Sequence, residues 1–93
     1  MIIGAVTMRL YAPWVSSLKE KRMVVKSIIA KVHNKFHVAI AEVAEQDTLQ
    51  TVVLGMACVA GTVRQADSIV DHVLRFVEEI TEAEVTDIQR ELR

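Results

Sequence analysis

Two segments of the sequence, Ile2–Ala12 and Leu49–Ala60, consist mostly of β-branched and small apolar residues. Successive side chains of a strand point to opposite faces, and in both segments each set of alternate residues is largely apolar. A strand of this kind has to be covered on both faces, so we predict that both segments are central strands of one sheet. This requirement restricts the possible folds more than any other feature of the chain.

The residues between these two segments include a predicted helix, Ser16–Phe36. Ser17 and Glu20 match the capping box, in which each of the two side chains accepts a backbone N–H at the helix start. The apolar residues recur with the helical period and fall on the side that must face a sheet: Leu18, Val25, Ile28, Ile29, Val32 and Phe36.

The rest of the chain supplies two further strands and a second helix. Val38–Ala44 is rich in apolar residues and is predicted to be a strand. Thr62 with Gln65 forms a weaker capping box for a helix that ends near Ile80. The last segment, Thr81–Arg93, is predicted to be a charged edge strand, although its apolar residues also fit a helical stripe.

The resulting order, β-α-β-β-α-β, is the ferredoxin-like split arrangement. We therefore expect one α+β domain over residues 1–93, with two helices on one face of a four-stranded antiparallel sheet. The opposite face would expose apolar side chains: Ile3, Ala5, Val53, Ala57 and Val59. Because a monomer rarely leaves such a patch bare, we expect a homodimer or larger homo-oligomer to form through it.

Charge is distributed unevenly along the chain. Residues 1–36 hold seven Lys or Arg and one acidic residue, a net charge of +6, whereas residues 37–93 hold four and eleven, a net charge of −7. The cations of the first helix lie on two borders of its apolar stripe: Lys19, Arg22, Lys26 and His33 on one, Lys21, Lys31 and Lys35 on the other. Lysine stems can cover the edge of the core while their charged ends stay in water.

This asymmetry indicates a basic face for an anionic partner, or contact between oppositely charged faces of two copies. The candidate nucleic-acid-binding residues are four cations: Arg9, Lys19, Arg22 and Lys26. We expect them to contact phosphates, helped by free N–H groups at the helix start. RNA-recognition domains on this fold carry stacking aromatics on the first and third strands, where this chain has only Tyr11, so backbone and shape would be recognised. The alternative is an ordinary amphipathic helix with solvated charges.

Other residues that might suggest catalysis or metal binding fit less well. The loop Ala12–Ser17, where acylphosphatases of this fold hold an anion, contains no glycine or arginine. His33 and His37 have the spacing of a helical metal pair, yet the helix ends near Phe36 and no third ligand is evident. Cys58 lies on an apolar strand and is expected to pack as an inert thiol. We therefore predict no enzyme activity, no cofactor and no metal site.

Two isolated residues have alternative environments. Trp14, in the loop that Pro13 begins, is predicted to cap the core rather than to be exposed for contact. Glu42 lies in an apolar strand, where a carboxylate either meets a cation, such as an arginine, or points to solvent near a strand end. We expect the ion pair.

The composition is compatible with the cytoplasm. A single cysteine cannot form an intrachain disulfide, which fits a reducing compartment. No basic-then-apolar leader opens the sequence, and no apolar run approaches the length that spans a membrane. We therefore expect a cytoplasmic protein.

Several runs of residues resemble the YlxP-like proteins, small bacterial proteins grouped as a domain of unknown function. The matching runs are Met1–Gly4, Ser17–Arg22, Val24–Ser27, Ala41–Val43 and Gln46–Asp47. The Ser-Leu-Lys-Glu-Lys-Arg run is the most specific, and the match extends through nearly the whole chain, weakening toward its end.

The resemblance implies a ferredoxin-like fold and a function near RNA or the ribosome, because genes of the family often lie beside those for translation initiation and ribosome maturation. The family has no agreed catalytic residues to carry over. Our leading hypothesis is a non-enzymatic RNA- or ribosome-associated binding protein that uses the basic first helix. The alternative is an oligomeric structural or regulatory module that assembles through its apolar sheet face and its oppositely charged faces.

Overall fold

Strands and helices follow one another along the chain in the order that the sequence predicts. The computed structural model describes all 93 residues, and every expected element is present within a few residues of its predicted ends. The elements are β1 (Ile2–Tyr11), α1 (Leu18–Lys35), β2 (Ala39–Ala44), β3 (Thr51–Ala60), α2 (Val63–Ile80) and β4 (Glu84–Leu92). The ambiguous last segment is a strand, as expected, and not a third helix.

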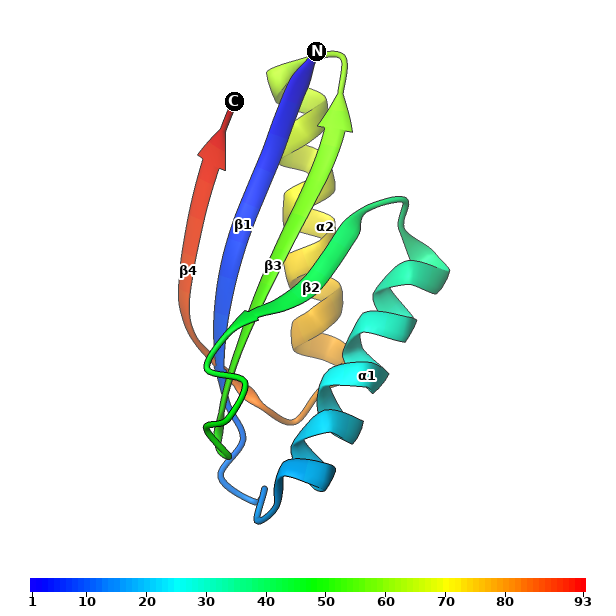
Figure 1. Ribbon diagram of the computed structural model, residues 1–93. Coiled ribbons are helices and arrows are strands. Elements are labelled where there is room, and N and C mark those ends of the chain that lie inside the picture. Colours follow the sequence, from blue (N-terminus) through cyan, green and yellow to red (C-terminus); the bar gives the residue numbers. More distant parts are fainter.

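The four strands form one antiparallel sheet in the order β2-β3-β1-β4 (Figure 1). β1 and β3 occupy the middle, so the prediction made from their two apolar faces is confirmed. They pair without a break over ten residues, from Ile2 opposite Ala60 to Tyr11 opposite Thr51. Each edge strand contains one register shift, which in β2 falls between Glu42 and Ala44.

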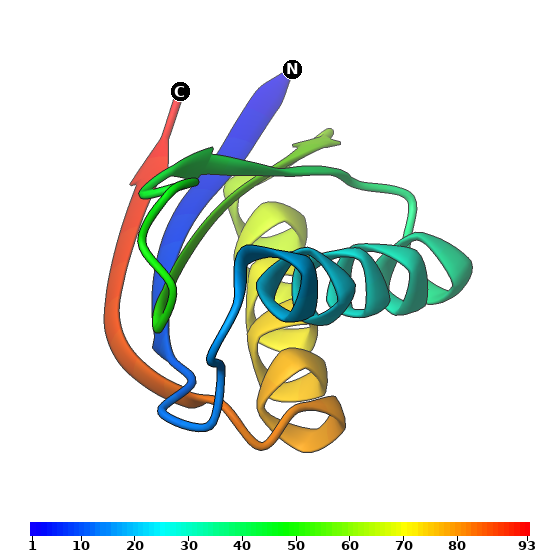
Figure 2. The ribbon, with the colours of Figure 1, turned by 60° about the horizontal axis from the view of Figure 1, so that its bottom comes forward.

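Both helices lie on the same side of the sheet (Figure 2). α2 packs across the two central strands, and α1 packs against β2 and α2. The core between the layers is made of alternate residues of the central strands and one stripe of each helix. Its fully buried members include Met8, Leu10, Val32, Val52, Leu54, Val73 and Val77. Neither helix is long and apolar enough to cross a membrane.

The helix starts are capped as the sequence predicts, with one difference in detail. The Ser17 hydroxyl oxygen accepts the Glu20 backbone N–H at 3.1 Å. The Glu20 carboxylate accepts the N–H of Ser16, one residue before the N-cap, at 2.7 Å. At α2, Thr62 accepts the N–H of Gln65 at 3.1 Å in the same way. Each cap satisfies backbone donors that the helix itself leaves free.

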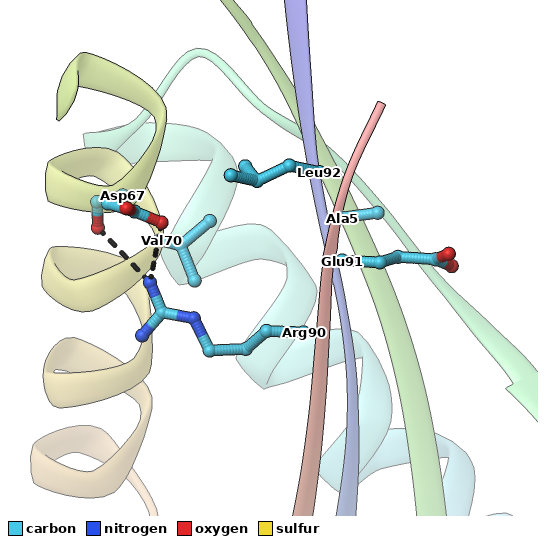
Figure 3. A pocket seen from close by; sticks show the side chains of 6 residues that line it. All are labelled: Ala5, Asp67, Val70, Arg90, Glu91 and Leu92. Carbon is cyan, nitrogen blue, oxygen red and sulfur yellow. Dashed lines mark hydrogen bonds and ion pairs between the residues drawn. The ribbon is translucent and has the colours of Figure 1, made fainter. Parts of the chain in front are cut away.

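β4 is joined to the rest of the molecule from both sides. Its last residue is followed by Arg93, which exchanges two backbone hydrogen bonds with Ile3 at 2.7 and 2.8 Å. On the side of the sheet that the helices cover, the Arg90 guanidinium of β4 reaches α2. Its nitrogen atoms lie 2.5 Å from a carboxylate oxygen of Asp71 and 3.3 Å from one of Asp67. Figure 3 shows Arg90 extending from the strand toward Asp67 on the helix.

Candidate nucleic-acid interface

Three cations lie on the exposed side of α1. Lys19, Arg22 and Lys26 are all exposed, and none forms an ion pair with a carboxylate. Residues three and four apart are neighbours on a helix surface, so the three side chains form one row along the first two turns. We call this row the α1 cation row. The structure brings these three predicted residues together.

The core fixes which side of α1 faces solvent. Val25, Ile28 and Val32 are buried against the sheet and the second helix, so the residues opposite them must be exposed. Met23 lies among the row's residues and is 64% exposed. The helix therefore presents a basic surface with an apolar side chain in it.

Lys21 was expected to lie at the border of the helix with its charged end in water, but the structure shows it buried. Its side chain is 2% exposed and points into the protein. Its ammonium nitrogen lies 3.2 Å from Glu42 Oε2 and donates a hydrogen bond to the backbone carbonyl of Glu45. The ion pair predicted for Glu42 is therefore confirmed, with a lysine as the cation in place of the suggested arginine.

The contact from Lys21 secures the turn after β2. Glu45 has a φ of 58°, the left-handed conformation that is uncommon for residues other than glycine. Its carbonyl also accepts the Thr48 N–H at 3.1 Å, and its carboxylate accepts the Thr48 hydroxyl at 2.9 Å. The first turns of α1 and the β2–β3 turn are thus held to each other at one end of the molecule (Figure 1).

Arg9, the fourth predicted nucleic-acid-binding residue, does not belong to the basic surface of α1, so the structure does not bring it together with the other three. Met8 and Leu10 are fully buried beneath the helices. Because side chains alternate along a strand, Arg9 points to the opposite, open face of the sheet. There it lies opposite Asp87 of β4 in the strand register.

The start of α1 is also less free to bind an anion than expected. The Ser17 hydroxyl accepts one of the first N–H groups, and the Glu20 carboxylate lies in the same first turn. That carboxylate places a negative charge where the helix dipole would favour a bound anion. The positive charge that this surface offers to an anion therefore comes from the side chains of the α1 cation row.

Trp14 is exposed, which contradicts the expectation that it caps the core. Trp14 is 44% exposed, whereas Ala12 and Val15 on either side of it are buried. The smaller residues Ala12 and Val15 take the core positions at this bend, so the indole is directed outward. The loop Ala12–Ser17 leads directly from β1 into the capped start of α1.

The open face of the sheet is apolar over β2, β3 and the start of β1, whereas Arg9, Asp87 and Glu91 lie toward its β4 edge. The predicted interface residues belong to the apolar part, with one exception. Ile3, Ala5 and Ala57 are partly exposed and Val59 is 65% exposed. Val53 is only 5% exposed yet lies outside the main core cluster. It sits between Arg9 and Ala44 in the strand register, beside the bulge of β2, and these neighbours leave little of it accessible. Val53 is therefore removed from the predicted oligomer interface.

A shallow hollow of about 290 Å³ lies in the middle of this open face. It is formed where β1, β2 and β3 carry small residues: Ala5, Ala39, Ala41, Gly55 and Ala57. Val43 and Val59, which are both more than half exposed, also belong to the apolar part of this face. The face thus combines protruding branched side chains with a depression of small ones.

Residues 3–90 match the family described as "Protein of unknown function (DUF503)". The chain belongs to this family. The resemblance to YlxP-like proteins is thereby confirmed. An uncharacterized protein YlxP of Bacillus subtilis (strain 168) is 43% identical to this chain over 70 residues. These residues cover 75% of this chain and 76% of that protein. A de novo designed protein with ferredoxin fold, solved by solution NMR, is similar over the whole chain and 86% of its own, with a TM-score of 0.53 and 22% identity. That likeness shows the ferredoxin-like fold alone.

In this DUF503 chain the two histidines considered for a metal lie at the end of α1. His33 is in the last turn and His37 lies beyond the C-cap residue Phe36, and both line a hollow of about 680 Å³ next to the open face. No group of three or more His, Cys, Asp or Glu is placed to hold a metal ion. Cys58 is buried in the core, as expected.

A further hollow of about 330 Å³ lies between α2 and β4 (Figure 3). Arg90, its cation, is already bound to Asp67 and Asp71, so it is not free to hold an anion. The hydrogen bond from Arg90 lowers the pKa of the Asp71 carboxyl, and the same bond raises the pKa of Arg90. This group fastens the edge strand to the helix.

Proposed function

We propose that this protein is a cytoplasmic RNA-binding protein that associates with ribosomal RNA or a ribosomal subunit. It binds without catalysis, and the contacts are made by the α1 cation row. The observation that carries the proposal is that Lys19, Arg22 and Lys26 are exposed side by side with no carboxylate partner. Unpaired cations in a row are the electrostatic requirement for binding a phosphate backbone.

The geometry of the row fits a backbone better than a single anion. From Lys19 to Lys26 the helix rises by about 10 Å. The three charges are therefore spaced to contact successive phosphates and do not converge on one anion. The helix start is occupied by Glu20 and Ser17, which leaves no dedicated pocket for one phosphate. The resemblance to YlxP-like proteins, with their neighbouring translation genes, favours ribosomal RNA among possible RNAs.

A triple charge reversal tests this function. Lys19→Glu, Arg22→Glu and Lys26→Glu together should abolish retardation of ribosomal RNA in a gel at low salt. For the wild-type protein, the logarithm of the affinity should fall with the logarithm of salt by roughly 0.7 to 0.9 per phosphate contacted. The matched control reverses three other exposed cations, Lys31, Arg64 and Arg75, and alters the net charge equally.

The control variant should keep most of the affinity, because its changes lie outside the α1 cation row. Equal loss in both variants would mean that only total charge matters. A wild-type protein that purifies without nucleic acid, fails to retard ribosomal RNA and does not sediment with ribosomal subunits would refute the proposal.

We also propose, as a second function, that the chain assembles with a second copy through the open sheet face. A two-fold contact requires one surface to complement itself. This face offers both elements of such a fit, since Val43 and Val59 protrude and a hollow of small residues lies on the same face. The residues that β2 and β3 place on this face are uncharged, since Glu42 of β2 points to the helix side and pairs with Lys21, so two copies meet there without repulsion.

The size of the face agrees with a stable dimer. A sheet four strands wide and up to ten residues long spans roughly 600 Å², and a standard interface buries roughly 800 Å² per partner. Val59→Asp should shift the mass measured by light scattering to the monomer at micromolar protein. Val63→Asp is the matched control, because Val63 is exposed on α2, away from the sheet face, and it should leave the mass unchanged. A monomeric wild-type protein would refute this assembly.

A further inference from the structure

The four aromatic residues of the chain divide into a packed pair and an exposed pair. Phe36 and Phe76 meet edge to face at the end of α1, with their ring centroids 5.5 Å apart. Trp14 and Tyr11 are 44% and 42% exposed at the other end of the molecule, where β1 leads into the start of α1. The exposed aromatics thus lie at the same end as the α1 cation row.

The loop that carries Trp14 is held in place on both sides of the ring. The Ala12 N–H donates to the Gln50 carbonyl at 2.8 Å, and the Val15 N–H donates to the Ala12 carbonyl at 3.2 Å. The Gln50 side-chain amide donates to the Pro13 carbonyl at 3.1 Å. The indole is therefore presented by a fixed loop, and little ordering would be required when a partner binds.

The loop that carries the ring leads directly into the helix that carries the α1 cation row. Trp14 lies three residues before the N-cap Ser17, and Lys19 and Arg22 follow within the first two turns of α1. An exposed aromatic ring at the same end of the molecule as a row of cations matches the arrangement that binds single-stranded nucleic acid, in which bases stack on aromatics and cations follow the backbone. In a duplex the base faces are covered by neighbouring base pairs except at its two ends, so the interior of a duplex offers no face to the indole.

We propose that Trp14 is a stacking platform for an unpaired base of the RNA whose phosphates contact Lys19 and Arg22. This inference rests on the proposed RNA-binding function and adds that the preferred ligand is unpaired RNA. Stacking accepts every base, which agrees with an α1 cation row that contacts phosphates and not base edges. Trp14 then supplies the part of the affinity that depends on strandedness.

Because Trp14 is the only tryptophan of the chain, its emission reports on this one site. The probes are a fluorescein-labelled 12-nucleotide RNA of mixed sequence and the duplex formed with its complement. Single-stranded RNA should quench the tryptophan emission in parallel with the rise of fluorescein anisotropy. The duplex should bind with little quenching.

Variants give the same test in terms of affinity. Trp14→Ala should weaken binding of the single strand by about 5- to 150-fold, the range found when a stacking ring is removed, and should leave duplex binding unchanged. Trp14→Phe keeps a ring and should recover part of the loss. Circular dichroism and the melting temperature show whether both variants fold like the wild-type protein.

The outcomes separate this inference from the function on which it rests. In one outcome, single-stranded RNA binds through Lys19 and Arg22 but does not change the tryptophan emission, and it binds Trp14→Ala as tightly as the wild-type protein. This outcome would overturn the stacking proposal and keep the RNA-binding one. An equal loss for single strand and duplex in a folded Trp14→Ala variant would show a structural effect and also overturn it. A wild-type protein that binds neither RNA would overturn both.

Discussion

Lys21 Nζ lies 3.2 Å from Glu42 Oε2, and the lysine side chain is almost completely buried. The Glu42 oxygen accepts no well-directed hydrogen bond, so the contact is ionic, while the ammonium donates to the Glu45 carbonyl. The pair joins the first turns of α1 to β2 and to the turn that follows it. It therefore positions the helix whose opposite side carries the α1 cation row.

Removing the lysine charge should destabilise the protein strongly. In Lys21→Met the aliphatic stem is replaced but Glu42 is left in a mostly buried site without its cation. Breaking a buried pair from one side costs about 3–5 kcal/mol in general, and we expect the lower part of that range because Glu42 keeps some contact with water. Urea unfolding at pH 7 measures the change in the free energy of unfolding.

The control for this prediction is Lys31→Met, in which an exposed lysine of the same helix is changed. It should alter the free energy of unfolding by less than about 0.5 kcal/mol. The double variant Lys21→Met with Glu42→Leu should recover much of the lost stability, because no unpaired charge remains. A single Lys21→Met variant as stable as the wild-type protein would contradict the buried pair.

Gly4→Ala should disturb the contact between β1 and α2. A Cβ atom at this position would lie 3.0 Å from Cys58 Sγ and 3.3 Å from a methyl carbon of Val70. Overpacking of this kind costs about 1–3 kcal/mol of folding free energy. Gly61→Ala is the control, because its Cβ would meet no atom closer than 3.8 Å, and that variant should unfold at nearly the wild-type urea concentration.

The Arg90–Asp71 pair predicts a dependence of stability on acid pH. The hydrogen bond from Arg90 holds the pKa of Asp71 below its ordinary value of 3.8. A group with a lowered folded-state pKa stabilises the fold above the unfolded-state pKa and loses that contribution as the pH falls through the folded-state pKa. The contribution should therefore be complete at pH 5 and decline below about pH 4.

This pH dependence is checked by urea unfolding of the wild-type protein and of Asp71→Asn at pH 7 and pH 3. The stability difference between the two proteins should be present at pH 7 and shrink at pH 3. Asp47→Asn changes an exposed carboxylate that forms no ion pair, and it should show no such difference. A difference between wild type and Asp71→Asn that is the same at both pH values would contradict the prediction.

The layers of the fold were predictable because they follow from local patterns. Two strands apolar on both faces had to be central, and the capping residues at Ser17 and Thr62 marked where the helices begin. Lys21 could not be placed in this way, since a helical pattern treats lysine as a surface residue. Its burial depends on a carbonyl 24 residues later in the chain, which only the folded structure brings to it.

Other errors have different causes. Trp14 was misplaced because loop conformation decides which of several apolar residues enters the core, and no periodic pattern exists there. The burial of Val53 depends on the register shift of β2, which the sequence does not indicate. The position of Arg9, in contrast, could have been predicted from the alternation of side chains along a strand, which puts it on the same face as Ile3 and Ala5.

The placement of Arg9 leads to the last prediction, a comparison of two single charge reversals. Arg9→Glu and Lys19→Glu change the net charge equally, but only Lys19 belongs to the α1 cation row, because Arg9 lies on the other face of the sheet. Lys19→Glu should weaken binding of ribosomal RNA and lower the salt slope by roughly one phosphate contact, whereas Arg9→Glu should leave both nearly unchanged. Filter binding at several salt concentrations measures both quantities. A loss of affinity in Arg9→Glu as large as that in Lys19→Glu would place RNA on the open sheet face and contradict the assignment to α1.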